Sequence, residues 1–89
     1  MQAEIYTKTV CPFCIRAKRL LTEKSIPYVE YIISPGVDED KPAENQFYIT
    51  RDVLLEKLPS AKTVPQIWLD GEHIGGYEDL VEYFAENPQ

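Results

Sequence analysis

The 89-residue sequence predicts a small α/β domain with the element order βαβαββα. Three observations predict this class. A β-rich segment runs into a helical pattern and is followed by a second β-rich segment; an Asp-Gly pair separates two apolar runs; and the C-terminal part returns to helical spacing. The length suits one small core. We therefore expect a single domain over residues 1–89, with a four-stranded mixed sheet flanked by helices.

The first half predicts a right-handed βαβ unit. Residues 4–7 are expected to form a short strand because they include β-branched and aromatic side chains. From Pro12 to about residue 24 good helix formers dominate, and proline fits the first helical position because its missing N–H needs no partner there. Residues 25–27, Ser-Ile-Pro, end that helix. Residues 28–33, YVEYII, then predict a second strand parallel to the first.

The middle of the chain is less regular. Residues 34–48 contain Pro35-Gly36 and an acidic run, and we expect a loop there with at most one helical turn. Thr50 is a suitable N-cap for a short helix with the sequence RDVLLEKL, which Pro59 ends.

The last third predicts a hairpin and a helix. An apolar run over residues 67–69 leads into Asp70-Gly71, a tight-turn pair, and a return strand continues through Ile74. Pro65 belongs at the start of this hairpin or at a sheet edge because proline cannot donate within a central ladder. Residues 77–85 have one apolar face at helical spacing.

Composition excludes several classes of protein. A hydrophobic fraction of 44% argues against disorder, and a net charge of −6 disfavours nonspecific binding to nucleic acid. The N-terminal residues show no secretion signal, and no run of about 18 apolar residues indicates a membrane span. We therefore expect a cytoplasmic protein that does not bind membranes or nucleic acid.

The two cysteines, Cys11 and Cys14, carry the strongest chemical signal. A structural disulfide between them closes too small a loop to stabilise the fold much. A zinc site needs four ligands, and beyond this pair only His73 is a soft ligand. A pair shared between two chains around an iron–sulfur cluster stays open. A C-x-x-C beside a βαβ pattern favours a redox dithiol.

The expected position of Cys11 explains how this pair could react. Where a strand ends and a helix begins, free N–H groups and the helix dipole favour a thiolate, and Lys8 and Arg16 add positive charge. Such surroundings lower a cysteine pKa from about 8.5 to roughly 3.5–7.5. We expect Cys11 to be the nucleophile. Cys14, on the same side of the first turn, is expected to resolve a mixed disulfide formed at Cys11.

The segments CPFCIRAKRLL and TVPQIWLDGEHIGGYEDL, with this element order, resemble the dithiol glutaredoxins of small bacterial and phage type. The resemblance implies a thioredoxin fold and a thiol–disulfide oxidoreductase that uses glutathione as co-substrate, with no tightly bound cofactor and no metal. Its expected partners are glutathione and proteins that carry disulfides or glutathionylated cysteines, with ribonucleotide reductase as a plausible substrate. A monomer is expected.

The resemblance also implies a binding site for glutathione. Pro65 is expected to be cis and to face the active cysteine, while the backbone of Val64 pairs with the cysteinyl backbone of glutathione and Thr63 flanks it. Lys8 is similar to the family's basic residue for the glycyl carboxylate, and Arg51 is a candidate for a second basic contact.

The other end of glutathione is expected at the start of the last helix. The N–H groups of Glu78 and Asp79 suit the γ-glutamyl carboxylate, and the Asp79 side chain suits the ammonium. Phe13 and Tyr77 are expected to wall the groove. The family often has threonine where Glu78 stands, so this carboxylate adds negative charge beside an anionic ligand.

Two rival hypotheses remain open at this stage. One is a redoxin reduced by thioredoxin reductase, against which the G-G-Y-x-D segment argues. The other is an iron–sulfur binding module in which two Cys11 thiolates and two glutathiones hold a cluster between chains. Pro12 stiffens the motif and, by the family resemblance, disfavours cluster binding.

Overall fold

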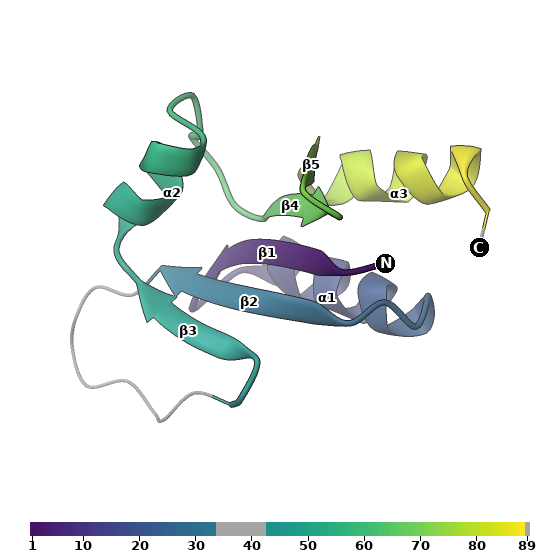
Figure 1. The fold of residues 1–89 in the computed structure, drawn as a ribbon, viewed down its shortest axis with the longest axis horizontal. Coiled ribbons are helices and arrows are strands. Elements are labelled where there is room, and N and C mark those ends of the chain that lie inside the picture. The colour runs from purple at the N-terminus through teal and green to yellow at the C-terminus, as the bar shows by residue number, and fades with distance from the viewer. Residues whose placement is uncertain (34–42, 89) are drawn as a thin grey trace.

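The computed structural model describes residues 1–33 and 43–88, and within them a single sheet is flanked by helices (Figure 1). No helix in these described residues is long and apolar enough to cross a membrane. In chain order the elements are β1 (Ala3–Lys8), α1 (Pro12–Glu23), β2 (Tyr28–Ile33), β3 (Gln46–Ile49), α2 (Arg51–Lys57), β4 (Gln66–Leu69), β5 (Glu72–Gly75) and α3 (Tyr77–Glu86).

The sheet has the strand order β3-β2-β1-β4-β5. Strands β1 and β2 are connected by α1 and pair in parallel, as the βαβ prediction requires. Strands β4 and β5 form the predicted antiparallel hairpin. Asp70 and Gly71 at its turn both have positive φ, 49° and 85°, as a type I′ turn requires. The α/β class, the mixed sheet and the three predicted helices are confirmed.

Strand β3 corrects the prediction for the middle of the chain. Residues 46–48 were expected in a loop, but they belong to an edge strand that pairs in parallel with β2, so the sheet has five strands instead of four. The Phe47 ring stacks on Tyr31 of β2 at a centroid distance of 5.8 Å. A four-residue edge strand has too few residues to show a period of two, and its pairing depends on the neighbouring strand. The remainder of the predicted loop, residues 34–42, lies outside the described residues.

The main core lies between one face of the sheet and helices α1 and α3. Its fully buried side chains come from β1, α1, β4 and α3, and they are Ile5, Leu21, Ile67 and Leu80. These residues follow the period of two in the strands and the helical period in α1 and α3. The core therefore fixes α1 against β1, which sets the position of the residues just before α1.

The opposite face of the sheet is aromatic and packs against α2. Tyr6 and Trp68 are each 5% exposed, and Tyr6 stacks on Tyr31 with ring centroids 4.8 Å apart. The Lys57 ammonium of α2 lies 4.6 Å from the centre of the Trp68 ring, an attractive cation–π arrangement.

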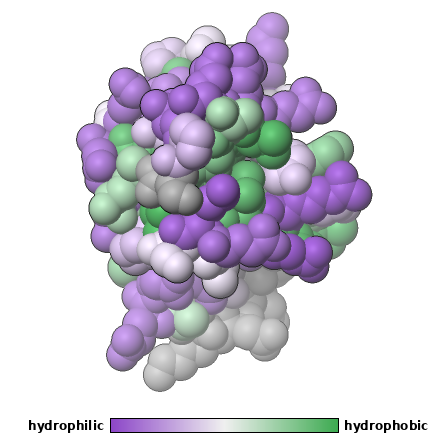
Figure 2. All heavy atoms as spheres, turned by 90° about the vertical axis from the view of Figure 1, so that its right-hand side faces the viewer, coloured by the Kyte–Doolittle hydropathy of each residue, from purple (hydrophilic) through white to green (hydrophobic). Residues whose placement is uncertain are grey.

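Figure 2 shows one end of the molecule, where hydrophilic side chains surround a smaller apolar area.

A buried carboxylate joins β1, α1, β2 and β3. Glu30 in β2 is 3% exposed and accepts hydrogen bonds from the Thr7 hydroxyl at 2.7 Å, the Lys18 ammonium at 3.0 Å and the Gln46 amide at 2.8 Å. Burial of the carboxylate acts to raise its pKa, but the hydrogen bonds from Gln46, Thr7 and Lys18 outweigh burial and hold the pKa of Glu30 below its ordinary value of 4.5. The charge is therefore satisfied in the folded protein, and it holds the end of β1 against α1.

Glu30→Gln is expected to lower the free energy of unfolding at pH 7 by about 2 kcal/mol, because hydrogen bonds to a charged acceptor are lost. The folded-state pKa of Glu30 lies below its unfolded value, so its stabilisation is complete above pH 4.5 and is lost as pH falls through the folded-state pKa. Urea titrations between pH 7 and pH 2.5 measure the difference between the wild type and the variant. That difference should shrink at low pH, whereas it should stay small and flat for the exposed control Glu23→Gln; a difference for Glu30→Gln that does not change with pH contradicts this role.

Candidate active site

The two cysteines lie at the start of α1 and form a disulfide in this structure. Cys11 is the N-cap residue, with extended backbone angles of φ −151° and ψ 98°, and its Sγ accepts a hydrogen bond of 3.2 Å from the Cys14 N–H. Cys11 is 5% exposed and Cys14 is 2% exposed. Both cysteines are therefore buried in the disulfide state, and a helix N–H points at the Cys11 sulfur, the arrangement that would favour a thiolate there.

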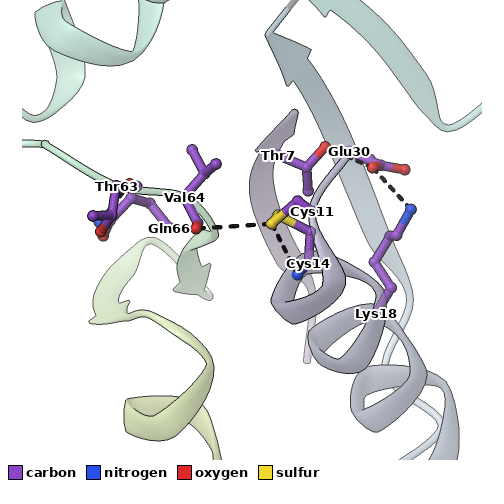
Figure 3. The surroundings of a disulfide bond; sticks show 8 residues. All are labelled: Thr7, Cys11, Cys14, Lys18, Glu30, Thr63, Val64 and Gln66. Carbon is purple, nitrogen blue, oxygen red and sulfur yellow. Dashed lines mark hydrogen bonds and ion pairs between the residues drawn. A yellow bond between two sulfur atoms is a disulfide. The ribbon is translucent and has the colours of Figure 1, made fainter. Parts of the chain in front are cut away.

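The loop before β4 lies opposite Cys11. The peptide bond between Val64 and Pro65 is cis, as the family resemblance implied. The Val64 carbonyl oxygen lies 3.9 Å from Cys11 Sγ, and Figure 3 shows it pointing from the loop towards the sulfur. Segments 53 positions apart in sequence thus meet at Cys11 Sγ.

A groove of about 320 Å³ runs from this loop to the start of α3. The Phe13 ring, 51% exposed, and the Tyr77 ring form one wall, with centroids 6.2 Å apart. The groove gathers every residue that the sequence analysis assigned to glutathione except the two basic residues Lys8 and Arg51, and it adds Gly76. Its lining residues are Phe13, Thr63, Val64, Pro65, Gly76, Tyr77, Glu78 and Asp79.

Lys8 lies in a smaller adjoining pocket of about 80 Å³, which shares Thr63 and Val64 with the groove. Arg51 at the start of α2 and Lys62 also line this pocket, so three basic side chains gather beyond one end of the groove. The sequence analysis selected Lys8 and Arg51 but missed Lys62. The only sequence feature that could have identified Lys62 is its position directly before the Thr-Val-Pro segment.

The start of α3 forms the other end of the groove. The first helical bond runs from the Leu80 N–H to the Gly76 carbonyl, and the Gly76 N–H donates to Asp79 Oδ2 at 2.9 Å. The N–H groups of Glu78 and Asp79 precede that first bond, so they have no helical acceptor. Asp79 therefore caps its own helix with one oxygen and keeps a second carboxylate oxygen as an acceptor.

His73 does not take part in this groove. It lies on β5, where its Nε2 is 2.9 Å from Gln66 Oε1. Within residues 1–33 and 43–88, no three His, Cys, Asp or Glu side chains come together in a group that could hold a metal ion.

Comparisons with known proteins agree on one family. The family model described as Glutaredoxin matches residues 3–74, which include both cysteines and the cis-proline loop. Glutaredoxin 1 of Rickettsia conorii is 37% identical over 82 residues, which cover 92% of this chain and 71% of the relative. The structure of reduced Escherichia coli glutaredoxin has a TM-score of 0.68 and 34% identity, covering 98% of this chain and 96% of that one. A buckwheat glutaredoxin–glutathione complex shares the fold, with a TM-score of 0.65 and 23% identity over 96% of this chain and 69% of that one.

Gly75 supports the start of α3, because its φ of 123° favours glycine and a Cβ there would overlap the Asp79 side chain. Gly75→Ala is expected to lower the free energy of unfolding by about 2–4 kcal/mol, since backbone strain and a displaced cap add together. Gly71→Ala is the matched control: its φ of 85° is also positive, but a Cβ there meets nothing within 4 Å. Its expected cost is about 1–2 kcal/mol. Equal losses for the two variants, measured by chemical denaturation, would show that Asp79 is not displaced.

Proposed function

Since the chain belongs to the glutaredoxin family, whose members are thiol–disulfide oxidoreductases, we propose that it reduces protein disulfides and glutathione mixed disulfides with glutathione as the co-substrate. The observation that carries this proposal is the groove between the cis-proline loop and the start of α3, whose Val64 has its carbonyl oxygen 3.9 Å from Cys11 Sγ. A groove that lies beside this sulfur and ends at the N–H groups of a helix start suits a short peptide with a thiol in the middle.

We assign the middle of glutathione to the loop before β4. Val64 lines the groove next to Cys11 just before β4, and its backbone would pair with the cysteinyl residue of glutathione as an added strand does. Thr63 and Pro65 lie on either side and line the same groove. The glutathione sulfur would then lie near Cys11 Sγ.

The two charged ends of glutathione fit the two ends of this site. Lys8, with Arg51 and Lys62, supplies positive charge for the glycyl carboxylate. At the other end, the N–H groups of Glu78 and Asp79 suit the γ-glutamyl carboxylate, and the second oxygen of Asp79 suits the ammonium. Phe13 and Tyr77 cover the ligand between these ends.

The proposed reaction is a series of thiol–disulfide exchanges. The Cys11 thiolate attacks the glutathione sulfur of a mixed disulfide, and the protein thiolate leaves and takes up a proton. A second glutathione thiolate then attacks the same glutathione sulfur, which releases glutathione disulfide and restores Cys11. With a protein disulfide, Cys14 attacks the mixed disulfide at Cys11, releases the reduced substrate and leaves the Cys11–Cys14 disulfide, the state seen here. Two glutathiones then reduce that disulfide.

The family resemblance also suggests where this chemistry takes place. We infer that the protein works as a monomer in the cytoplasm, where a reduced glutathione pool restores the dithiol. Its proposed substrates are proteins with disulfides or glutathionylated cysteines, ribonucleotide reductase among them. We also propose that residues 1–89 act as a single domain.

The proposal predicts different outcomes for the two cysteine variants. Cys11→Ser is expected to lose at least about 1,000-fold in turnover of a glutathione mixed disulfide, because its hydroxyl is not ionised at neutral pH. Cys14→Ser is expected to stay within about threefold of the wild type, because that reaction needs only one thiolate. The assay couples glutathione disulfide formation to glutathione reductase and NADPH.

Two further experiments identify the rival functions. Wild-type protein that is inactive with glutathione but is reduced by NADPH and thioredoxin reductase would overturn glutathione dependence. A stable brown protein with visible absorbance after anaerobic cluster reconstitution would favour the iron–sulfur module.

Glu78 provides a test of the groove itself. Its exposed carboxylate lines the site of an anionic ligand, so Glu78→Thr is expected to lower the KM for the glutathione mixed disulfide about twofold to threefold, an effect of the size expected for exposed charges. The gain should disappear at 0.5 M salt, because screening removes it. Glu86→Thr, at the far end of α3, is the control for net charge and should leave the KM unchanged. A KM that does not fall for Glu78→Thr at low salt would place the ligand elsewhere.

A further inference from the structure

Two side-chain hydrogen bonds connect the hairpin to the loop that faces Cys11. The Gln66 side-chain amide in β4 donates to the Thr63 carbonyl oxygen at 3.0 Å, and His73 Nε2 in β5 lies 2.9 Å from Gln66 Oε1. Figure 3 shows Gln66 and Thr63 on the far side of Val64 from Cys11. The two contacts therefore reach Thr63 from the side opposite Cys11, and Thr63 and Val64 both line the groove.

The direction of these bonds follows from the chemistry of the groups. Since the Thr63 carbonyl can only accept, the NH₂ group of Gln66 faces it, and Oε1 of Gln66 must face His73. Oε1 can only accept, so His73 Nε2 donates and carries the proton in both the neutral and the charged ring. The His73 ring also packs on Trp68, with centroids 4.6 Å apart, and Trp68 is 5% exposed. A buried ring thus holds the histidine that orients the glutamine.

The bond to Thr63 determines the direction of the Val64 N–H. The Thr63 carbonyl and the Val64 N–H belong to one planar peptide unit and point in opposite directions. A donor on the carbonyl therefore fixes the plane and aims the N–H away from Gln66, and it also polarises the unit so that the N–H becomes a stronger donor. Val64 lines the groove next to Cys11, where the ligand's cysteinyl backbone is proposed to bind.

We propose that Gln66 and His73 are positioning residues that hold the Thr63–Val64 peptide plane and so set how strongly the groove binds the cysteinyl part of glutathione. The inference rests on the proposed function. Neither side chain lines the groove, and neither touches Cys11 in this structure. Their effect is therefore expected on ligand affinity and not on the reactivity of the sulfur.

Three variants test these contacts. Gln66→Leu and His73→Leu remove the bond to Thr63 and its support, and each is expected to raise the KM for the glutathione mixed disulfide about fivefold, the equivalent of one ordinary hydrogen bond. Gln66→Glu places a carboxylate oxygen against the Thr63 carbonyl and is expected to raise the KM at least about tenfold. In all three, kcat should stay within twofold, and so should the alkylation rate of reduced Cys11 by iodoacetamide.

Two further variants separate positioning from a general loss of stability. His73→Gln keeps a donor close to the position of Nε2 and is expected to bring the KM back to within twofold of the wild type. Glu72→Gln changes the neighbouring exposed residue of β5, which faces away from this contact in the ladder, and should leave the KM unchanged. Circular dichroism and thermal melts of each variant confirm that the protein compared is folded.

A measurement without glutathione tests the inference independently of the proposed function. The backbone amide resonance of Val64, observed in ¹H–¹⁵N spectra of the reduced protein, should move in Gln66→Leu and His73→Leu and stay in place in Glu72→Gln. A Val64 resonance that does not move in folded Gln66→Leu overturns the positioning role. If the resonance moves as expected but the wild-type protein has no activity with glutathione, the contact between Gln66 and the loop stands. The proposed function then fails, and so does the claim that this contact sets the affinity for glutathione. Unchanged KM values in an active enzyme also overturn the inference.

Discussion

The position of Cys11 at the end of one strand and the start of a helix is the constraint on which the site depends. Its Sγ accepts the Cys14 N–H, so the sulfur occupies the place that a side-chain oxygen usually takes at a helix N-cap. A negative charge on this sulfur would be stabilised by the same N–H and by the helix dipole. Any movement of α1 relative to β1 would change both, so the packing that fixes these elements also fixes the chemistry.

Two kinds of packing provide that fixation. The apolar core buries Leu21 of α1 against Ile5 of β1, which sets the separation of helix and sheet without fixing direction. The hydrogen bonds to Glu30 are directional, and they connect the Thr7 hydroxyl at the end of β1 with the Lys18 ammonium in α1. Together they hold the elements on both sides of Cys11. The buried Glu30 carboxylate is tolerated because Thr7, Lys18 and Gln46 satisfy its charge.

The proposed recognition of glutathione relies largely on backbone groups. The Val64 backbone, the start of α3 and the basic pocket come from three parts of the chain, and the fold brings them to one side of the molecule. Asp79 orients its helix start through Gly76, and Gln66 contacts the Thr63 carbonyl behind Val64. Backbone donors held in this way would lose little freedom when the proposed ligand binds, which favours affinity even in a small site.

Local signals in the sequence determined most of the fold. The helical spacing after Pro12, the Asp-Gly turn, the helix after Gly76 and the C-x-x-C pair are short-range patterns. That Thr-Val-Pro lies opposite Cys11 followed from the family resemblance and not from a local pattern. Tertiary structure alone decided strand β3, since an edge strand of four residues forms through its partner β2. It also decided that Lys62 joins Lys8 and that His73 supports Gln66, because contacts between residues distant in sequence, or across a hairpin bulge, leave no periodic trace in the chain.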